Sequence, residues 1–142
     1  MPFADDLVVY VDAQSTALTA GTSLFKNSVP ETTGRACFIV ETRGQSAIEK
    51  FGGLPAMTRP QADVVVRSTK AVGGAGIASS TGTRSLAQDV WEILVQVANT
   101  SLNSKTYQRV TTLSDPYYMG TDEQGRALFG FQVSALRAAT TN

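Results

Sequence analysis

The chain has 142 residues, of which 42% are hydrophobic and 17% are charged, a composition typical of one globular domain. Its 12 basic and 12 acidic side chains cancel, which disfavours nucleic-acid binding through a broad basic surface and suits a protein that assembles. The chain has no histidine and one cysteine, Cys37. These counts exclude Ser-His-Asp and Cys-His catalysis, histidine-based or cysteine-cluster metal sites, and an intrachain disulfide. We therefore predict a protein that is not an enzyme and that has no cofactor.

The first segment, Phe3 to about Thr16, is predicted to be a helix. Its apolar residues recur at helical spacing, namely Phe3, Leu7, Val8 and Val11. Asp5 and Asp6 lie in its first turn, where carboxylates favour the helix dipole. A strand is the competing interpretation, because residues 7–11 form an apolar run. This run is too short to span a membrane and its flanks are too acidic for a signal peptide, so we expect folding in a reducing cytoplasm.

Three strand-like runs follow, over residues 23–29, 36–42 and 62–69. The second alternates cleanly, with Ala36, Phe38 and Val40 on one face and Cys37, Ile39 and Glu41 on the other. We expect Cys37 to be a small buried hydrophobe. The third contains three consecutive valines, 64–66, which predict a strand covered on both faces. Between the second and third runs, the glycines and prolines of residues 52–60 predict a loop.

Residues 70–83 are rich in glycine, alanine and serine and nearly uncharged, so we predict a flexible loop. It lacks the Lys-Ser/Thr pair of a P-loop and the third glycine of a dinucleotide fingerprint, so its glycines do not predict a phosphate site. A long loop in a compact domain is usually functional. We expect this loop at a subunit or partner contact, with Gly74 and Ile77 as candidate interface residues.

The strongest helical pattern runs from Leu86 to about Thr100, with Val90, Leu94 and Val97 as expected core residues. Two strands are then predicted, over residues 106–113 and 127–136. Together these elements indicate an α+β domain spanning residues 1–142. We expect a small mixed or antiparallel sheet of about four to five strands, with two main helices packed on it.

The segment between the last two strands holds the remaining candidate interface residues. Pro116 forces the chain out of the preceding strand, and three large side chains follow, Tyr117, Tyr118 and Met119. Neither strand nor helix periodicity buries all three in one small core, and such residues are enriched at protein contacts. The alternative is that two of them tuck under the sheet edge. Residues 123–126 are predicted to turn back into the final strand. We expect at least one of Tyr117, Tyr118 and Arg126 to contact another subunit or a partner. The nearby acids lack the EF-hand spacing, so no metal site is predicted.

Several short segments, taken in order along the chain, match a known family. They are residues 3–8, 21–26, 53–55, 59–60 and 64–67, followed by the single long helix and the stretch from Asp115 to Phe129. That stretch, with its Asp-Glu-x-Gly-Arg order, is the most specific part. The segments resemble the small tail-completion, or minor capsid, proteins of tailed bacteriophages, and the closest group is the tail terminators of long-tailed phages. The resemblance covers nearly the whole chain.

This resemblance implies a ring, commonly of six copies, that caps the finished tail tube, stops its polymerisation and presents a surface to the neck. It implies a virion location at the tail–neck junction after assembly in the host cytoplasm. The implied partners are the protein itself, the tail tube protein and a neck or head-completion protein, and genomic DNA passes through without specific binding. Residues 70–83 depart from the family, whose members have a short charged link there. The alternatives are a head-completion or head–tail adaptor ring, and a non-viral α+β module that binds a small molecule.

Overall fold

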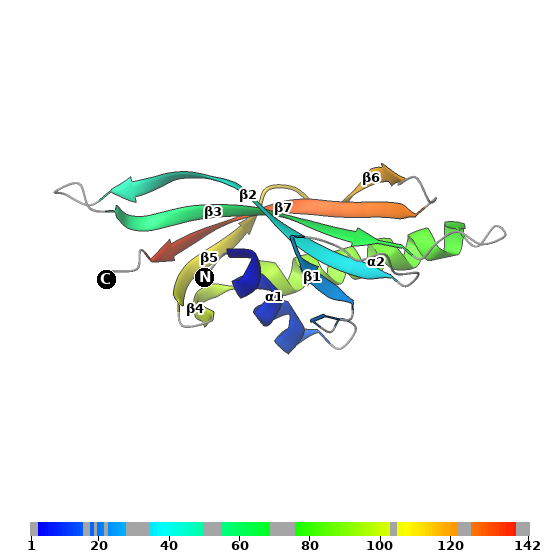
Figure 1. The fold of residues 1–142 in the computed structure, drawn as a ribbon, viewed down its shortest axis with the longest axis horizontal. Coiled ribbons are helices and arrows are strands. Elements are labelled where there is room, and N and C mark those ends of the chain that lie inside the picture. Colours follow the sequence, from blue (N-terminus) through cyan, green and yellow to red (C-terminus); the bar gives the residue numbers. More distant parts are fainter. Residues whose placement is uncertain are drawn as a thin grey trace.

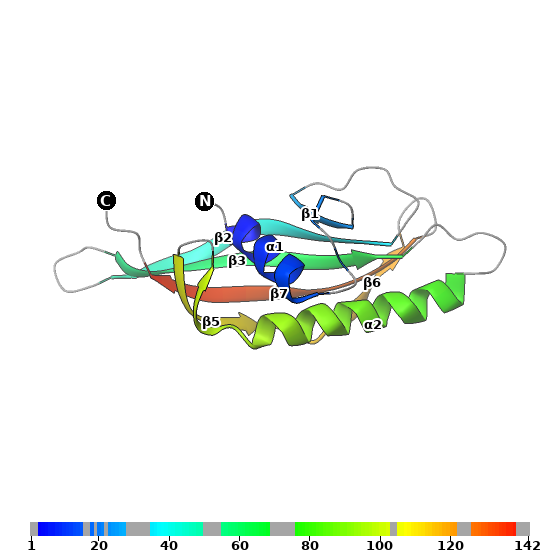
Figure 2. The same cartoon turned by 90° about the horizontal axis from the view of Figure 1, so that it is seen from below.

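The computed structural model describes residues 3–15, 18, 20–21, 23–27, 35–49, 55–68, 76–102, 105–121 and 126–138. Two helices pack on one face of a long, curled sheet (Figures 1 and 2). The elements in chain order are α1 (Phe3–Gln14), β1 (Leu24–Lys26), β2 (Ala36–Glu49), β3 (Pro55–Arg67), α2 (Gly76–Val95), β4 (Ala98–Leu102), β5 (Lys105–Thr112), β6 (Tyr117–Thr121) and β7 (Ala127–Ala138).

The sheet has the strand order β1-β2-β3-β7-β5-β4, and β6 pairs with β7 outside this path. β1 is parallel to β2, and every other pairing between the named strands is antiparallel. One edge of β7 pairs with β3, while β5 and β6 share its other edge. The α+β class with two main helices is confirmed. Among the described residues the sheet has seven strands rather than four to five. β1 lies within the predicted strand-like run over residues 23–29, whereas β4 and β6 are too short to show a repeating pattern in the sequence.

The core lies between the helices and one face of the sheet. α1 contributes Phe3, Leu7 and Val11, and α2 contributes Ala87, Val90 and Leu94. The sheet contributes alternate residues from its central strands, namely Cys37, Ile39, Ala62, Val64, Val66, Val110, Phe129, Phe131, Val133 and Ala135. The helical and strand periodicities seen in the sequence are therefore confirmed at these positions. Val97 is buried as expected, but it lies just after α2 rather than inside it.

The predicted loop over residues 70–83 is wrong from residue 76 onwards. α2 begins at Gly76, so Ile77 lies in a helix, whereas residues 70–75, including Gly74, lie outside the described residues. Residues 76–83 have a low intrinsic helix propensity, but tertiary packing supplies most helical stability in proteins. Thr83, for example, is buried against the rest of the protein. The helix also ends earlier than predicted, at Val95, because residues 98–102 pair with β5 as strand β4.

The predicted loop over residues 52–60 is also wrong in its second part, since β3 begins at Pro55 and includes Pro60. A proline in a central strand normally removes a ladder hydrogen bond. Here Pro60 lies between the pairs Thr42–Gln61 and Gln45–Arg59, where the register with β2 shifts. The irregularity removes the need for a backbone donor at this position, so the strand continues through the proline.

A buried polar cluster fastens α1 to the sheet, and no motif in the sequence indicates it. Asp6 is fully buried and accepts a hydrogen bond from the hydroxyl of Tyr107, and Arg137 Nη1 lies 3.8 Å from Asp6 Oδ2. Arg137 also donates to Tyr107 Oη at 3.4 Å and to Thr58 Oγ1 at 3.2 Å. Burial, and then the hydrogen bond to Asp6, raises the pKa of Tyr107 well above its ordinary value. The ring of Tyr107 stacks on Phe3 as well.

Cys37 is fully buried, and burial raises the pKa of its thiol from 9.0 to about 12. Because the folded protein keeps this thiol protonated, ionisation of Cys37 in the unfolded chain favours unfolding. The folded state therefore keeps its full stability below the unfolded pKa of 9.0 and loses stability as pH rises towards 12. We expect wild-type stability to fall between pH ~9 and ~10 by up to about 1.4 kcal/mol, before Tyr107 contributes. Urea unfolding at a series of pH values measures this change in the free energy of unfolding. The Cys37→Ala variant should lack the decline, and an equal decline with pH in both proteins would contradict the expectation.

Candidate functional site

Two exposed surfaces are the candidate functional features of the described residues. In the described residues, no group of three or more His, Cys, Asp or Glu is placed to hold a metal ion. No helix among those residues is long and apolar enough to cross a membrane. Asp5 and Asp6 diverge, as adjacent helical positions should: Asp5 pairs with Lys26, whereas Asp6 points into the core.

The first candidate surface is the β6 patch, which consists of Leu113, Tyr117, Tyr118 and Met119. The exposed fractions of these side chains are 50%, 48%, 55% and 43%. The alternative in which two of the three β6 side chains tuck under the sheet edge is therefore wrong. The reason is that β6 pairs with the outer edge of β7 and has no described strand on its own far side. Tyr118 lies opposite Phe129 and so points to the helix side of the sheet, whereas Tyr117 lies opposite Gly130 and points to the other side. Large exposed apolar side chains of this kind are typical of a protein contact.

Several contacts hold the β6 patch in one geometry. The chain enters β6 through Ser114, whose carbonyl accepts a hydrogen bond of 3.3 Å from Trp91 Nε1 on α2. The ring of Tyr118 lies 5.4 Å from that of Phe129, and its hydroxyl lies 2.6 Å from Thr121 Oγ1. A register shift next to Gly120, whose φ is +109°, interrupts the regular pairing of β6 with β7. A patch fixed in this way loses little side-chain entropy when a partner binds.

Gly130 on β7 leaves room for Met119. A Cβ atom at Gly130 would lie 2.5 Å from the carbonyl oxygen of Val64 and 2.6 Å from Met119 Sδ. The methionine can move, but the backbone of β3 cannot, so we expect Gly130→Ala to destabilise the protein by about 1–3 kcal/mol and to displace Met119. Chemical unfolding measures the loss, with Ser134→Ala on the same strand as the control. Equal stability of both variants would contradict this packing.

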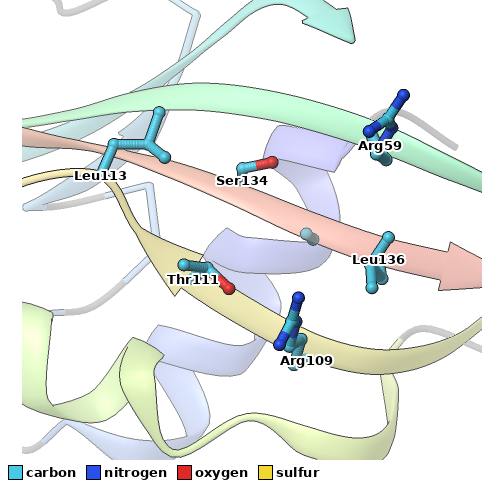
Figure 3. Close-up of a pocket in the computed structure, with 7 residues that line it drawn as sticks. Arg59, Arg109, Thr111, Leu113, Ser134 and Leu136 are labelled. Carbon is cyan, nitrogen blue, oxygen red and sulfur yellow. The ribbon is translucent and has the colours of Figure 1, made fainter. Parts of the chain in front are cut away.

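The second candidate surface lies on the face of the sheet opposite the helices, which we call the open face because no described helix covers it (Figure 1). A hollow of about 260 Å³ lies there across β3, β7 and β5 (Figure 3). Leu136 and Ser134 lie on β7 at its centre, with Arg59 to one side and Arg109 and Thr111 to the other. Leu113 also lines the hollow and so joins it to the β6 patch.

The remaining predicted interface residues lie elsewhere. Arg126 is only 3% exposed, so it does not form part of the β6 patch. It precedes Ala127, which makes two hydrogen bonds with Ser68 at the end of β3. Ala127 N donates to Ser68 Oγ at 2.8 Å, and Ser68 N donates to Ala127 O at 2.9 Å. Ile77 lies in the first turn of α2, and Gly74 lies outside the described residues. The sequence showed no sign of the hollow, because its residues come from three separate strands.

Comparison with known proteins gives a fold but no family. No family model matches the chain, and no curated protein matches it. Among solved structures, the chain is similar to a component of the virion of a native gene transfer agent particle, with 16% identity, a TM-score of 0.61, and 96% of each chain covered. A second solved structure is 10% identical with a TM-score of 0.48, covering 99% of this chain and 93% of the other. That second likeness is too weak to carry an argument.

Proposed function

We propose that the protein is a structural component of a tailed, phage-like particle, in which it forms a ring at the end of the tail tube. The ring caps the tube, stops its polymerisation and joins the tail to the neck. The observation that carries the proposal is the fold shared with a gene transfer agent virion component over 96% of both chains. The resemblance of residues 115–129 and the other quoted segments to tail terminators supports it from the sequence.

The exposed surfaces suit this role. A ring of identical subunits needs two different, complementary surfaces on each subunit, so that every copy binds the next one head to tail. Docking onto a tube needs a third surface. We assign docking to the β6 patch, because its apolar side chains are exposed and its strand edge is available for pairing with another protein. The zero net charge is compatible with DNA passing through the ring without being gripped.

A head-completion or head–tail adaptor ring is the second candidate. The specific observation behind it is that the similar solved structure is the virion of a gene transfer agent particle, a whole particle, so the likeness does not single out one position within it. Loss of the two proteins has different consequences. Without a tail terminator, tails grow to irregular lengths. Without a head-side adaptor, tails keep their normal length but stay separate from the heads.

The experiment deletes the gene in the strain that produces the particles and measures tail length by electron microscopy. We expect tails of irregular length that lack heads, and restoration by the wild-type chain. A variant with Tyr117→Ser and Tyr118→Ser should fold normally by circular dichroism but fail to restore tails. The matched control is Val9→Ser, which removes an exposed apolar side chain from α1 and should restore them. Particles of normal form after deletion would refute the proposal.

A further inference from the structure

The outer edge of β6 is a free strand edge. β6 pairs with β7 on one side, and no described strand pairs with its other side. Proteins usually protect such an edge with charged residues or proline. The five residues of β6, Tyr117–Thr121, include no charged residue and no proline, and four of them are exposed. An unprotected edge of this kind is a template for a strand from another protein.

Two hydrogen bonds fix the direction of the backbone groups of β7. The carbonyl of Ala127 accepts from Ser68 N on the β3 side of β7, and the carbonyl of Gln132 accepts from Leu113 N on the other side. Successive residues of a strand point their backbone N–H and C=O groups to opposite sides. Gly130, which lies two residues before Gln132, therefore points its backbone groups toward β6.

Two residues of β6, Tyr118 and Thr121, point their own backbone groups away from the sheet. They lie opposite Phe129 and Ala127, whose groups point to β3, whereas the other paired residues of β6 lie opposite residues that point to β6. Since Phe129 and Ala127 are two residues apart, the outward groups repeat at about 7 Å despite the extra residue, Met119. This repeat is that of a regular strand, so one added strand can bond at both positions.

Exposed side chains flank this edge on both faces of the sheet. Tyr118 lies on the helix side, where its hydroxyl is 2.6 Å from Thr121 Oγ1. Tyr117 lies on the open face, and Met119 reaches the position that a Cβ atom of Gly130 would occupy on that face. A strand laid along the edge would contact large side chains above and below it, and no charge within β6 would be buried. The occupant that fits is an extended, uncharged segment with apolar side chains on both faces.

We propose that β6 receives an extended strand of the tail tube protein, which bonds to the backbone of Tyr118 and Thr121. This inference rests on the proposed docking role of the β6 patch and names the form that the partner takes there. A helix has no free backbone groups along its side. A docked helix would therefore bury the outward N–H and C=O groups of both residues without partners, which is costly. An added strand satisfies these groups and packs against both tyrosines at once.

A second copy of this chain is a poorer source of the strand. Two β6 edges pair only around a two-fold axis, which gives a closed pair of subunits rather than a ring. The part of β2 beyond Glu41 is the other long stretch of edge that no described strand pairs with. Its register with β3 shifts three times between Thr42 and Glu49, and such irregularities hinder pairing with another chain.

A matched pair of substitutions at Thr121 tests the backbone contact in the deletion strain. Thr121→Pro removes the outward N–H and no bond to β7, whereas Thr121→Val keeps that N–H. Both lack the hydroxyl that contacts Tyr118, so the pair differs at the backbone. We expect Thr121→Val to restore particles and Thr121→Pro to yield about tenfold fewer, because a hydrogen bond to the added strand is lost. Circular dichroism checks that both variants fold.

Hydrogen–deuterium exchange gives a second measurement, which needs no variant. In the isolated chain, the amides of Tyr118 and Thr121 should exchange faster than those of Tyr117 and Gly120, which point to β7. In purified particles, the two outward amides should become protected. Exchange at residues 117–121 that is the same in the particle as in the isolated chain would overturn the added strand.

The outcomes separate this contact from the proposed function. Equal particle yields from the two folded Thr121 variants would overturn the added strand. The docking role of the patch would still stand if the variant with Tyr117→Ser and Tyr118→Ser failed in the same strain. If the purified chain self-associates in sedimentation velocity and Thr121→Pro abolishes this, the strand comes from a second copy and its assignment to the tube is wrong. A harmless gene deletion would refute the proposed function itself.

Discussion

Val90→Asp is expected to leave no folded protein. Val90 is fully buried in the contact between α2 and the sheet, among the other side chains of the core. A carboxylate there would lose its hydration without gaining a partner, and that cost exceeds the stability of a typical domain of this size. The measurement is the near- and far-ultraviolet circular dichroism of the soluble fraction.

The matched control for this variant is Gln88→Asp, which introduces the same carboxylate two residues earlier on the exposed side of the same helix. It should fold like the wild type, because exposed substitutions usually change stability by less than about 0.5 kcal/mol. A native spectrum for Val90→Asp would mean that α2 does not pack on the sheet through this residue.

The second large effect is expected for Asp6→Ala, with a loss of about 3–5 kcal/mol in the free energy of unfolding. Removing the fully buried carboxylate leaves the hydroxyl of Tyr107 without its acceptor and the guanidinium of Arg137 without its counter-charge. The substitution thus costs more than one hydrogen bond, because the groups left behind remain partly desolvated. Urea unfolding measures the change.

Two further variants sharpen this test. Asp6→Asn keeps an acceptor for Tyr107 but removes the charge, so its stability should lie between those of the wild type and Asp6→Ala. Asp89→Ala removes an exposed carboxylate from α2 and should cost less than about 0.5 kcal/mol in the unassembled protein. If Asp6→Ala and Asp89→Ala were equally stable, the buried cluster would not fasten α1 to the sheet.

The parts of the fold that could be predicted were those with a sustained period. β7 alternates over ten residues, and the apolar stripe of α2 is regular from Leu86 to Leu94, so a single sequence sufficed for both. β6 was missed because Tyr117–Thr121 has large side chains on both faces and derives its strand form from pairing with β7. The first turns of α2 were missed because local composition favoured a loop and packing favoured a helix.

The candidate surfaces were predictable to different degrees. The exposure of all three of Tyr117, Tyr118 and Met119 was one of two interpretations that the sequence left open, and it depends on the place of β6 at the outer edge of β7. The burial of Arg126 could not be foreseen, because it depends on how the chain returns to β7 beside Ser68. The hollow needed the strand order, which brings residues 59, 109 and 136 together from distant parts of the chain.

The position of this chain in purified particles decides whether it is a structural component of the junction between tail and neck. Particles from the producing strain, labelled with a gold-conjugated antibody against the chain, can be examined by electron microscopy. We expect label at the junction between tail and head, in nearly every intact particle and absent from the deletion strain. A chain that stays in the lysate while intact particles carry no label would contradict a structural role in the virion.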